Sequence, residues 1–424
     1  MLFNSFEFAL YFPVVTLLYF ALRGGTRVYM LLAASLLFYA AFIPAYTLIL
    51  VAVILIDYSA GLLMAGTESP QRRRLFLALS LASNLGILIT FKFLNQHHWI
   101  LPIGLSFHTF QSMAYTIEVY KRRYPVERSL PHLALYVMFY PQLVAGPIER
   151  PQNLLRQLHL EHAFSLENLH AGLQLMFWGL FKKAAIADRL SPMVDAVFKN
   201  PDSGPLVVIG AIAFSFQIYC DFSGYSDMAI GAARVMGIDL TPNFRRPYFA
   251  SGFQDFWRRW HISLSSWFRD YVYFPLGATK LALIAVFLLS GLWHGSSWTF
   301  LIWGALHAAF RLAFPRTRWV VFPLTTYAWI FFRATSVAQA WHMTTQLTQG
   351  WLNNPLAPLG GLLNVFYAML AVGILLAVDW AQEHGQISWT TFSPWQRVVI
   401  YNAAILLLYA LWAKDSQQFI YFKF

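Results

Sequence analysis

The chain has 424 residues, of which 58% are hydrophobic and only 12% carry a charge. Soluble globular domains contain about 25% charged residues, so this composition excludes intrinsic disorder and argues against an ordinary cytosolic enzyme. The net charge of +11 indicates basic cytoplasmic loops of a membrane protein and not a surface that binds nucleic acid. Cys220 is the single cysteine, which excludes an intramolecular disulfide and a cysteine-rich metal site.

Apolar stretches separated by short polar segments recur along the whole chain. The first lies at residues 6–22, after an N-terminus without a positive region or a small-residue cleavage site, so we expect a retained span and not a signal peptide. Several others are shorter than the ~20 residues that cross a bilayer, and these are expected to be re-entrant or buried. The sequence predicts an all-α polytopic membrane protein with roughly ten to twelve crossings. The later stretches are residues 28–41, 45–64, 75–93, 101–119, 133–144, 169–181, 206–219, 229–237, 281–293, 298–310, 319–332, 362–380 and 398–412.

Basic residues gather between these stretches, and the positive-inside rule places such groups in the cytoplasm. Two apolar stretches separate the first two groups, so both are expected on the same side of the membrane. The alternative is that some of these side chains only anchor the chain at the membrane surface. The groups are residues 72–74, residues 121–128, Lys182 with Lys183, and Arg311 with Arg316 and Arg318.

The most polar segment, residues 220–270, is densely interleaved with aromatic residues. Polar side chains at membrane depth usually face a protein interior or a water-filled cavity. If residues 253–270 form one helix, Asp255 reaches Arg258 and Arg259, and His261 falls on the same face as the aromatic residues. This pattern predicts a partly buried or re-entrant segment. The alternative for His261 is a core histidine that donates a hydrogen bond to a carbonyl.

A second histidine, His294, lies in the glycine-flanked sequence SGLWHGSSW between two apolar stretches. Gly291 and Gly295 are four residues apart, so another backbone can approach closely here. A neutral imidazole is a good general base at neutral pH. The spacing therefore predicts either a reactive imidazole beside a substrate channel or a packing motif that contains a histidine by chance.

The remaining motifs are less specific. Pro102, Gly104, Gln111 and Glu118 interrupt the stretch at 101–119, which indicates a broken helix beside a cavity or a kinked helix. Neither a G-x-S-x-G elbow, a P-loop, a dinucleotide fingerprint nor H-E-x-x-H occurs. The histidine pairs, His97 with His98 and His159 with His162, fall in predicted loops without further ligands, so no metal site is predicted.

Several segments together resemble the membrane-bound O-acyltransferase (MBOAT) family, and within it the bacterial branch that includes the membrane subunit for alginate O-acetylation. The resemblance runs essentially from end to end, so one membrane domain over residues 1–424 is expected, with its catalytic core within 102–310. It implies a ring of helices, with re-entrant or interfacial helices, around a central channel. The matching segments are 1–8 (MLFNSFEF), 102–120, 139–151 (FYPQLVAGPIERP), 181–190 (FKKAAIADRL), 221–231 (DFSGYSDMAIG), 255–277 (DFWRRWHISLSSWFRDYVYFPLG), 291–295 (GLWHG) and 419–424 (FIYFKF).

The resemblance also implies the site and its chemistry. His294 is expected to be the catalytic histidine and His261 a second member of the site. The acyl donor is expected to be cytosolic acetyl-CoA, with no permanently bound cofactor. Asn243, Trp260 and Trp293 are expected to contact substrate beside the histidines. His261, or a nearby donor such as Asn243 or Trp260, is expected to orient the acyl donor or stabilise the oxyanion. Arg246 and Arg258, together with Arg245 and Arg259, are candidates for contacts to phosphate or carboxylate groups. The alternatives are ion pairing with Asp239 and Asp255 or anchoring at the membrane surface.

The function that the resemblance implies is O-acetylation of an extracytoplasmic, alginate-like polysaccharide by a protein of the bacterial inner membrane. The expected partners are membrane lipids, the polysaccharide acceptor and a periplasmic acetyltransferase of the serine-hydrolase type. Alternative acceptors are cellulose, another exopolysaccharide or peptidoglycan, and a D-alanyl group is an alternative donor. Outside the enzyme class, the alternatives are a transporter of acyl groups or glycans and a catalytically silent scaffold. One departure is the short basic segment 278–280, where relatives carry a longer one, and it puts a local contact to coenzyme A in doubt.

Overall fold

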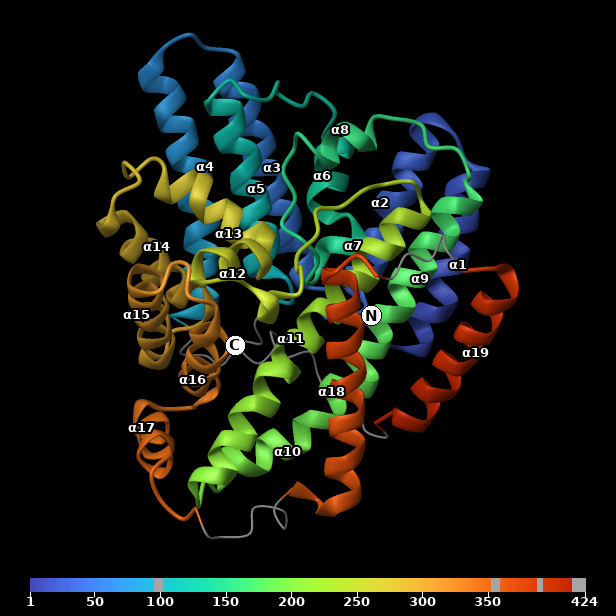
Figure 1. Ribbon diagram of the computed structural model, residues 1–424. Coiled ribbons are helices and arrows are strands. Elements are labelled where there is room, and N and C mark those ends of the chain that lie inside the picture. Colours follow the sequence, from blue (N-terminus) through green and yellow to red (C-terminus); the bar gives the residue numbers. More distant parts are fainter. Residues whose placement is uncertain (95–101, 352–358, 387–391, 414–424) are drawn as a thin grey trace. The chain divides into compact units, whose positions relative to one another are not determined.

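The computed structural model describes residues 1–94, 102–351, 359–386 and 392–413. Every regular element in these ranges is a helix, which confirms the all-α prediction (Figure 1). Four of the described helices are long and apolar enough to cross a membrane: α3 (Tyr46–Ala65), α4 (Pro70–Lys92), α11 (Gly204–Val235) and α18 (Gly361–Glu383). The predicted ten to twelve crossings are not confirmed, because most of the other apolar helices are shorter than a bilayer requires.

The chain divides into two compact units, Met1–Trp178 with Tyr225–Pro242, and Gly179–Gly224 with Asn243–Phe424. The single domain expected from the sequence stays a prediction. Besides α3 and α4, the first unit contains α1 (Phe6–Ala21), α2 (Gly24–Ala40), α5 (Leu105–Tyr120), α6 (Leu130–Met138), α7 (Tyr140–Leu143), α8 (Leu154–Leu158) and most of α9 (Leu166–Phe181). The predicted apolar stretch at 133–144 is thus divided between α6 and α7.

Helices α3, α4 and α5 lie side by side in the first unit (Figure 1). Gly61 of α3 permits this, since a Cβ there would stand 2.9 Å from the Tyr115 hydroxyl of α5. The Arg73 guanidinium of α4 donates to the carbonyls of Met64, Val119 and Tyr120 at the ends of the other two helices. The basic groups 72–74 and 121–128 therefore lie at the same end of this bundle, as their spacing predicted.

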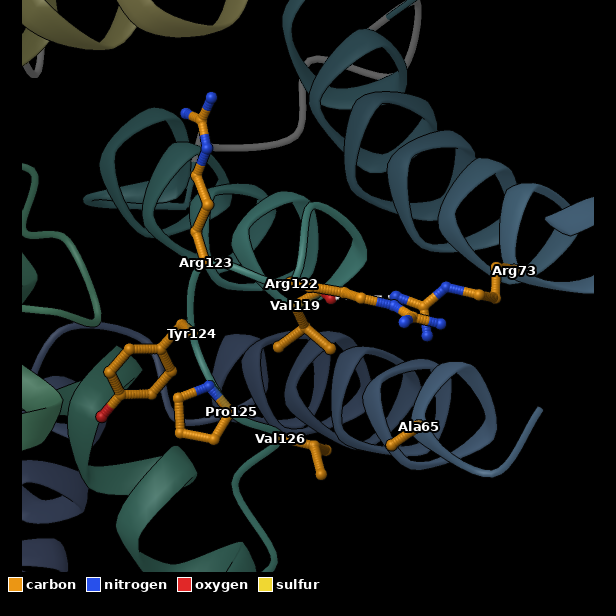
Figure 2. Close-up of a pocket in the computed structure, with 8 residues that line it drawn as sticks. All are labelled: Ala65, Arg73, Val119, Arg122, Arg123, Tyr124, Pro125 and Val126. Atoms are coloured by element: carbon orange, nitrogen blue, oxygen red, sulfur yellow. Dashed lines mark hydrogen bonds between the residues drawn. The ribbon is translucent and has the colours of Figure 1, made fainter. Parts of the chain in front are cut away.

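A pocket of about 410 Å³ lies at this basic end, with apolar walls and arginine side chains (Figure 2). The Arg122 side chain extends toward Arg73 and pairs with Glu68 at 2.5 Å, whereas Arg123 points away from both. Arg122 and Glu68 are both exposed. The exposed Arg122 and Arg123 therefore keep their charged ends in solvent beside this pocket.

Helix α5 is continuous from Leu105 to Tyr120, so the described part of the predicted stretch 101–119 is not a broken helix. Gly104 precedes it in a left-handed conformation (φ +75°), where a Cβ would stand 2.4 Å from the Leu143 carbonyl oxygen. The polar residues within the helix bond to neighbouring segments. Gln111 Nε2 donates to the Tyr136 carbonyl, and Glu118 Oε2 accepts from Gln152.

The second unit begins at the end of α9 and contains the site described below. Helix α11 joins the two apolar stretches predicted at 206–219 and 229–237 into one helix, because the polar residues between them continue the helix and are mostly buried. The unit contains η1 (Lys182–Ala187), α10 (Asp188–Lys199), most of α11, η2 (Pro247–Phe249), α12 (Phe253–Arg259), α13 (Ile262–Phe268), η3 (Arg269–Tyr273), α14 (Lys280–His294), α15 (Trp298–Ala313), η4 (Arg318–Val320), α16 (Val321–Arg333), α17 (Val337–Gln346), α18 and α19 (Pro394–Leu411).

Helices α14 and α15 form a tight helical pair, visible next to α16 in Figure 1. A Cβ on Gly291 would stand 2.4 Å from the Phe300 carbonyl oxygen, and one on Gly304 would stand 2.4 Å from that of Phe287. Glycines on both helices thus allow the backbones to touch. The close approach predicted for the glycine-flanked motif is confirmed, and it fixes the end of α14, where His294 lies.

Candidate active site

His294 is the last residue of α14 and is buried within the second unit. Its ring is enclosed by aromatic rings from its own helix, from α15 and from α16. The ring centroids lie 5.2 Å from Trp303 and 5.0 Å from Phe332, both edge to face. The imidazole is therefore held between large rigid rings and has little freedom to rotate.

His261 occupies the junction between α12 and α13, and here the predicted helix over residues 253–270 is wrong. Helix α12 ends at Arg259, and His261 has φ +44° and ψ +54°, the left-handed conformation. The chain therefore turns between Trp260 and Ile262. Helical spacing from α12 thus does not determine the direction in which the His261 side chain points. Left-handed backbone costs a β-carbon-bearing residue about 1–2 kcal/mol, so surrounding contacts must hold His261 in place.

Asn243 supplies one of those contacts and also defines the tautomer of His261. The same Asn243 side-chain atom receives the Ser263 backbone N–H at 3.2 Å and the Ser263 hydroxyl at 2.9 Å. A backbone N–H can only donate, so this atom is the amide oxygen. His261 Nδ1, which lies 3.2 Å from the same oxygen, must then carry a proton, and Nε2 carries the lone pair.

Burial also keeps the His261 ring neutral. The residue is 1% exposed, and this burial lowers the pKa of His261 to about 3. None of the four helices long enough to cross a membrane contains it. At neutral pH His261 is thus an uncharged imidazole that donates through Nδ1 and offers Nε2 as an acceptor or base.

Trp293 brings the two predicted histidines together. Its ring centroid lies 5.9 Å from that of His261 and 4.9 Å from that of His294. The residue precedes His294 on α14, so the same glycine-dependent packing fixes both. His261, Trp293 and His294 form one cluster inside the second unit, as the resemblance led us to expect.

Trp260 belongs to a layer of packed aromatic rings that connects it indirectly to His294. Its ring contacts Trp329 at 5.0 Å and stacks on Phe256 at 5.7 Å. Trp329 in turn stacks on Trp303, which contacts His294. Trp260 is 2% exposed and packed among these rings, and its predicted contact with substrate stays a prediction.

Two residues of this layer were missed by the sequence analysis. Trp303 contacts His294, and His307 lies 4.9 Å from Trp303, one turn further along α15. The Trp303 indole nitrogen and both His307 ring nitrogens are buried, and none has a hydrogen-bond partner within the described ranges. Both residues follow the GLWHG sequence closely and are four residues apart on the next helix. The residues around them are apolar throughout, however, so the sequence alone does not distinguish them from core residues.

The predicted arginines divide into paired and unpaired groups. Arg246 pairs with Glu383 at 2.7 Å, and Arg259 pairs with both Asp255 and Glu383 at 2.9 Å. Asp239 pairs with Arg234 instead. Arg245 and Arg258 are exposed, and no hydrogen bond or ion pair of either side chain occurs among the residues that the structure describes.

A buried ion-pair cluster also contradicts one prediction, that Lys182 and Lys183 lie in a cytoplasmic loop. Both lysines belong to the π-helical turn η1 and are buried. Lys183 Nζ lies 2.8 Å from Asp188 and 2.7 Å from Asp221, and these side chains are all about 4% exposed. Lys183 can be buried because two carboxylates, one from α10 and one from α11, neutralise its charge.

The histidine pairs that were considered as metal ligands have other surroundings. His159 Nε2 lies 2.6 Å from Glu127 Oε2, and its ring stacks on His132 at 4.0 Å. His162 Nε2 lies 3.0 Å from the Gln157 carbonyl oxygen. His97 and His98 lie outside the described residues, as does the matching segment 419–424.

Residues 29–318 match the model of the MBOAT, membrane-bound O-acyltransferase family. The chain belongs to this family, and both His261 and His294 fall inside the matched region. Together with its apolar helices, this membership makes the chain a multi-pass membrane protein.

Individual relatives are similar over most of the chain. A probable alginate O-acetylase AlgI of Azotobacter vinelandii is 38% identical over 337 residues, covering 72% of this chain and 66% of the relative. The corresponding protein of Pseudomonas aeruginosa is 37% identical, covering 72% and 64%. A peptidoglycan O-acetyltransferase of Helicobacter pylori is 36% identical over 364 residues, covering 72% and 69%. The chain spans about two thirds of the length of these curated relatives.

Proposed function

We propose that this chain is the membrane acyltransferase of an extracytoplasmic O-acetylation system, acting from the bacterial inner membrane on an alginate-like polysaccharide. The observation that carries the proposal is the single cluster in which His261 and His294 flank Trp293. The relatives whose names include alginate O-acetylation support the choice of reaction and acceptor. The basic groups 72–74 and 121–128 gather at one end of α3, α4 and α5. By the positive-inside rule this end faces the cytoplasm, which supports a cytosolic donor, acetyl-CoA.

In the proposed reaction an acceptor hydroxyl attacks the carbonyl carbon of the acetyl thioester. His294 removes the hydroxyl proton as the new C–O bond forms, which requires the acceptor oxygen within about 3 Å of an imidazole nitrogen. The C–S bond then breaks, and the imidazolium returns the proton to the departing thiolate. The rings of Trp303 and Phe332 around His294 support this role, because they hold the imidazole in one orientation.

The tautomer of His261 decides what this residue contributes. With the proton on Nδ1, its Nε2 can accept but cannot donate a hydrogen bond. His261 is therefore suited to orient the acceptor hydroxyl or an amide N–H of the donor, and not to stabilise an oxyanion. The Trp303 indole N–H, which is buried beside His294, is the donor we assign to the negative charge that develops on the thioester oxygen.

We assign Arg258 and Arg245 as the side chains that bind the phosphates of the donor. Both side chains are exposed and are not neutralised by an acidic partner in the described ranges, unlike Arg246 and Arg259. Arginine binds phosphate oxygens through paired N–H groups. Arg246 remains a substrate-contact prediction from the sequence, although its pairing with Glu383 gives it a structural task.

The acetyl group is proposed to reach the polysaccharide through a periplasmic acetyltransferase of the serine-hydrolase type. Peptidoglycan is the second candidate acceptor, because the Helicobacter pylori relative is similar over a comparable share of this chain. The purified protein, incubated with acetyl-labelled acetyl-CoA, tests the donor by thiol release and the acceptor by label transfer. We expect label on mannuronate-rich oligosaccharides once the periplasmic partner is added. Label on muropeptides alone would favour the second candidate, and absence of thiol release would contradict the acyltransferase proposal.

A further inference from the structure

A buried polar cluster lies between α3, α4 and α5 of the first unit and takes no part in the proposed reaction. Its centre is the Asp57 carboxylate of α3, which is 1% exposed. The Ser80 hydroxyl donates to Oδ1 at 2.6 Å, and the Ser112 hydroxyl donates to Oδ2. Asn84 Nδ2 donates to both oxygens at 3.1 and 2.9 Å.

No basic residue in the described part of the chain forms an ion pair with Asp57. The Arg73 guanidinium is bonded to the carbonyls that end α3 and α5, almost two turns from Asp57 along α3. Helices α3 and α4 are both candidate membrane spans, with Asp57 near the middle of α3. An uncompensated charge at this depth costs several kcal/mol.

Oxygen atoms from three helices converge on the carboxylate. The Ser80 and Thr116 hydroxyl oxygens lie 3.0 Å apart, and both residues are completely buried. The Asn84 Oδ1 atom is buried on the amide that contacts Asp57, and it has no hydrogen-bond partner in the part of the chain that the structure describes. The amide faces Asp57 through Nδ2, so this oxygen lies on its other side. A half-turn of the amide would bring the oxygen to the carboxylate, which is the arrangement that a bound cation would complete.

We propose that Asp57, Ser80, Asn84, Ser112 and Thr116 form a binding site for one alkali cation. Carboxylate, amide and hydroxyl oxygens are ligands for hard cations. The single carboxylate matches a monovalent ion, because a divalent ion would leave a buried net positive charge. The hydroxyls and the amide would turn their lone pairs toward the ion, which would then fasten the three helices at mid-depth.

Thermal unfolding of the full chain in detergent tests the site without reference to acyl transfer. NaCl, KCl and choline chloride are exchanged at constant ionic strength and pH. An ion that binds only the folded state raises the unfolding free energy by RT ln(1 + [L]/Kd). We therefore expect a saturable rise of Tm with sodium or potassium that choline does not reproduce. Asp57→Asn should lose this dependence, whereas Glu68→Gln, at an exposed surface pair, should retain it.

Two further measurements keep the proposal falsifiable if Asp57→Asn does not fold. Ser112→Ala retains the carboxylate but removes one ligand oxygen, so the half-saturating cation concentration should increase several-fold. Direct binding of ²²Na⁺ to the parent should be displaced by unlabelled NaCl and not by choline chloride. Equal Tm values in all three salts would overturn the proposal. A second result would also overturn it: a Tm that changes with pH but not with the salt, and whose pH dependence disappears in Asp57→Asn. Asp57 would then be protonated in the folded protein and would not bind a cation.

Discussion

Asn243 Oδ1 lies 3.2 Å from His261 Nδ1 and accepts a hydrogen bond from its N–H. Because the same oxygen also accepts two hydrogen bonds from Ser263, the orientation of the Asn243 amide is fixed. The contact holds a histidine whose backbone is in the left-handed conformation. These contacts make Asn243 a positioning residue for His261, and the substrate contact predicted from the sequence stays a prediction.

Asn243→Ala should therefore misplace the His261 ring and leave the binding of substrate largely unchanged. Leaving buried donors unpaired costs about 1–3 kcal/mol of stability, and misplacement of a reacting group costs about 10²-fold in rate. We expect kcat for thiol release to fall by roughly that factor while KM for acetyl-CoA changes little. An increase in KM with unchanged kcat would show that Asn243 contacts the donor.

The buried neutral His261 predicts acid sensitivity of the fold. Its pKa of about 3 in the folded state lies below the ~6.5 of an unfolded imidazole. Between these values the unfolded chain takes up a proton that the folded chain does not, so stability falls as pH decreases. This group alone should lower the unfolding free energy by about 1.4 kcal/mol per pH unit below pH 6.5.

His261→Asn is the matched variant for this measurement, because asparagine tolerates left-handed backbone. Its unfolding midpoint should fall less steeply than that of the parent between pH 6.5 and 4. Other titrating groups contribute equally to both proteins and cancel in the comparison. Parallel pH profiles would show that His261 does not titrate in this manner.

Arg258 and Arg259 are neighbours in sequence, but we predict opposite phenotypes. Arg258→Gln should raise KM for acetyl-CoA by about tenfold, the loss of roughly 1.4 kcal/mol expected for a charged hydrogen bond to phosphate, with unchanged Tm. Arg259→Gln breaks the pairs with Asp255 and Glu383 and should lower stability by about 1 kcal/mol with little effect on KM. Identical KM values for Arg258→Gln and the parent would remove Arg258 from the donor site.

The buried ion-pair cluster predicts a large stability effect far from any substrate contact. Lys183→Met leaves the Asp188 and Asp221 carboxylates buried without their cation. Removing one partner of such a cluster costs about 3–5 kcal/mol. Thermal unfolding in detergent should show a drop of several degrees, and a Tm equal to that of the parent would mean that the carboxylates reach water.

The elements with regular apolar patterns were predictable from the sequence. The first apolar stretch is a helix, although it is shorter than the four candidate spans. The close backbone approach at Gly291 and the proximity of His261 and His294 to Trp293 also agree with the structure. The Asp255–Arg259 pair also formed, since it depends only on helical spacing.

Features that depend on distant partners could not be predicted. Glu383, 124 residues after Arg259, neutralises two arginines that the sequence offered for phosphate binding. Lys183 is buried because two carboxylates from other helices meet it. His261 ends the predicted helix because its left-handed backbone is held by Asn243, a contact that local propensity does not encode.

The most direct test of the account is single-turnover thiol release from acetyl-CoA by His294→Gln. Removal of a general base should slow this step by about 10²–10⁴-fold, with folding checked by Tm. His342→Gln changes an exposed histidine on α17 and should match the parent. If His294→Gln releases thiol at the rate of the parent, the assignment of His294 as the base is wrong.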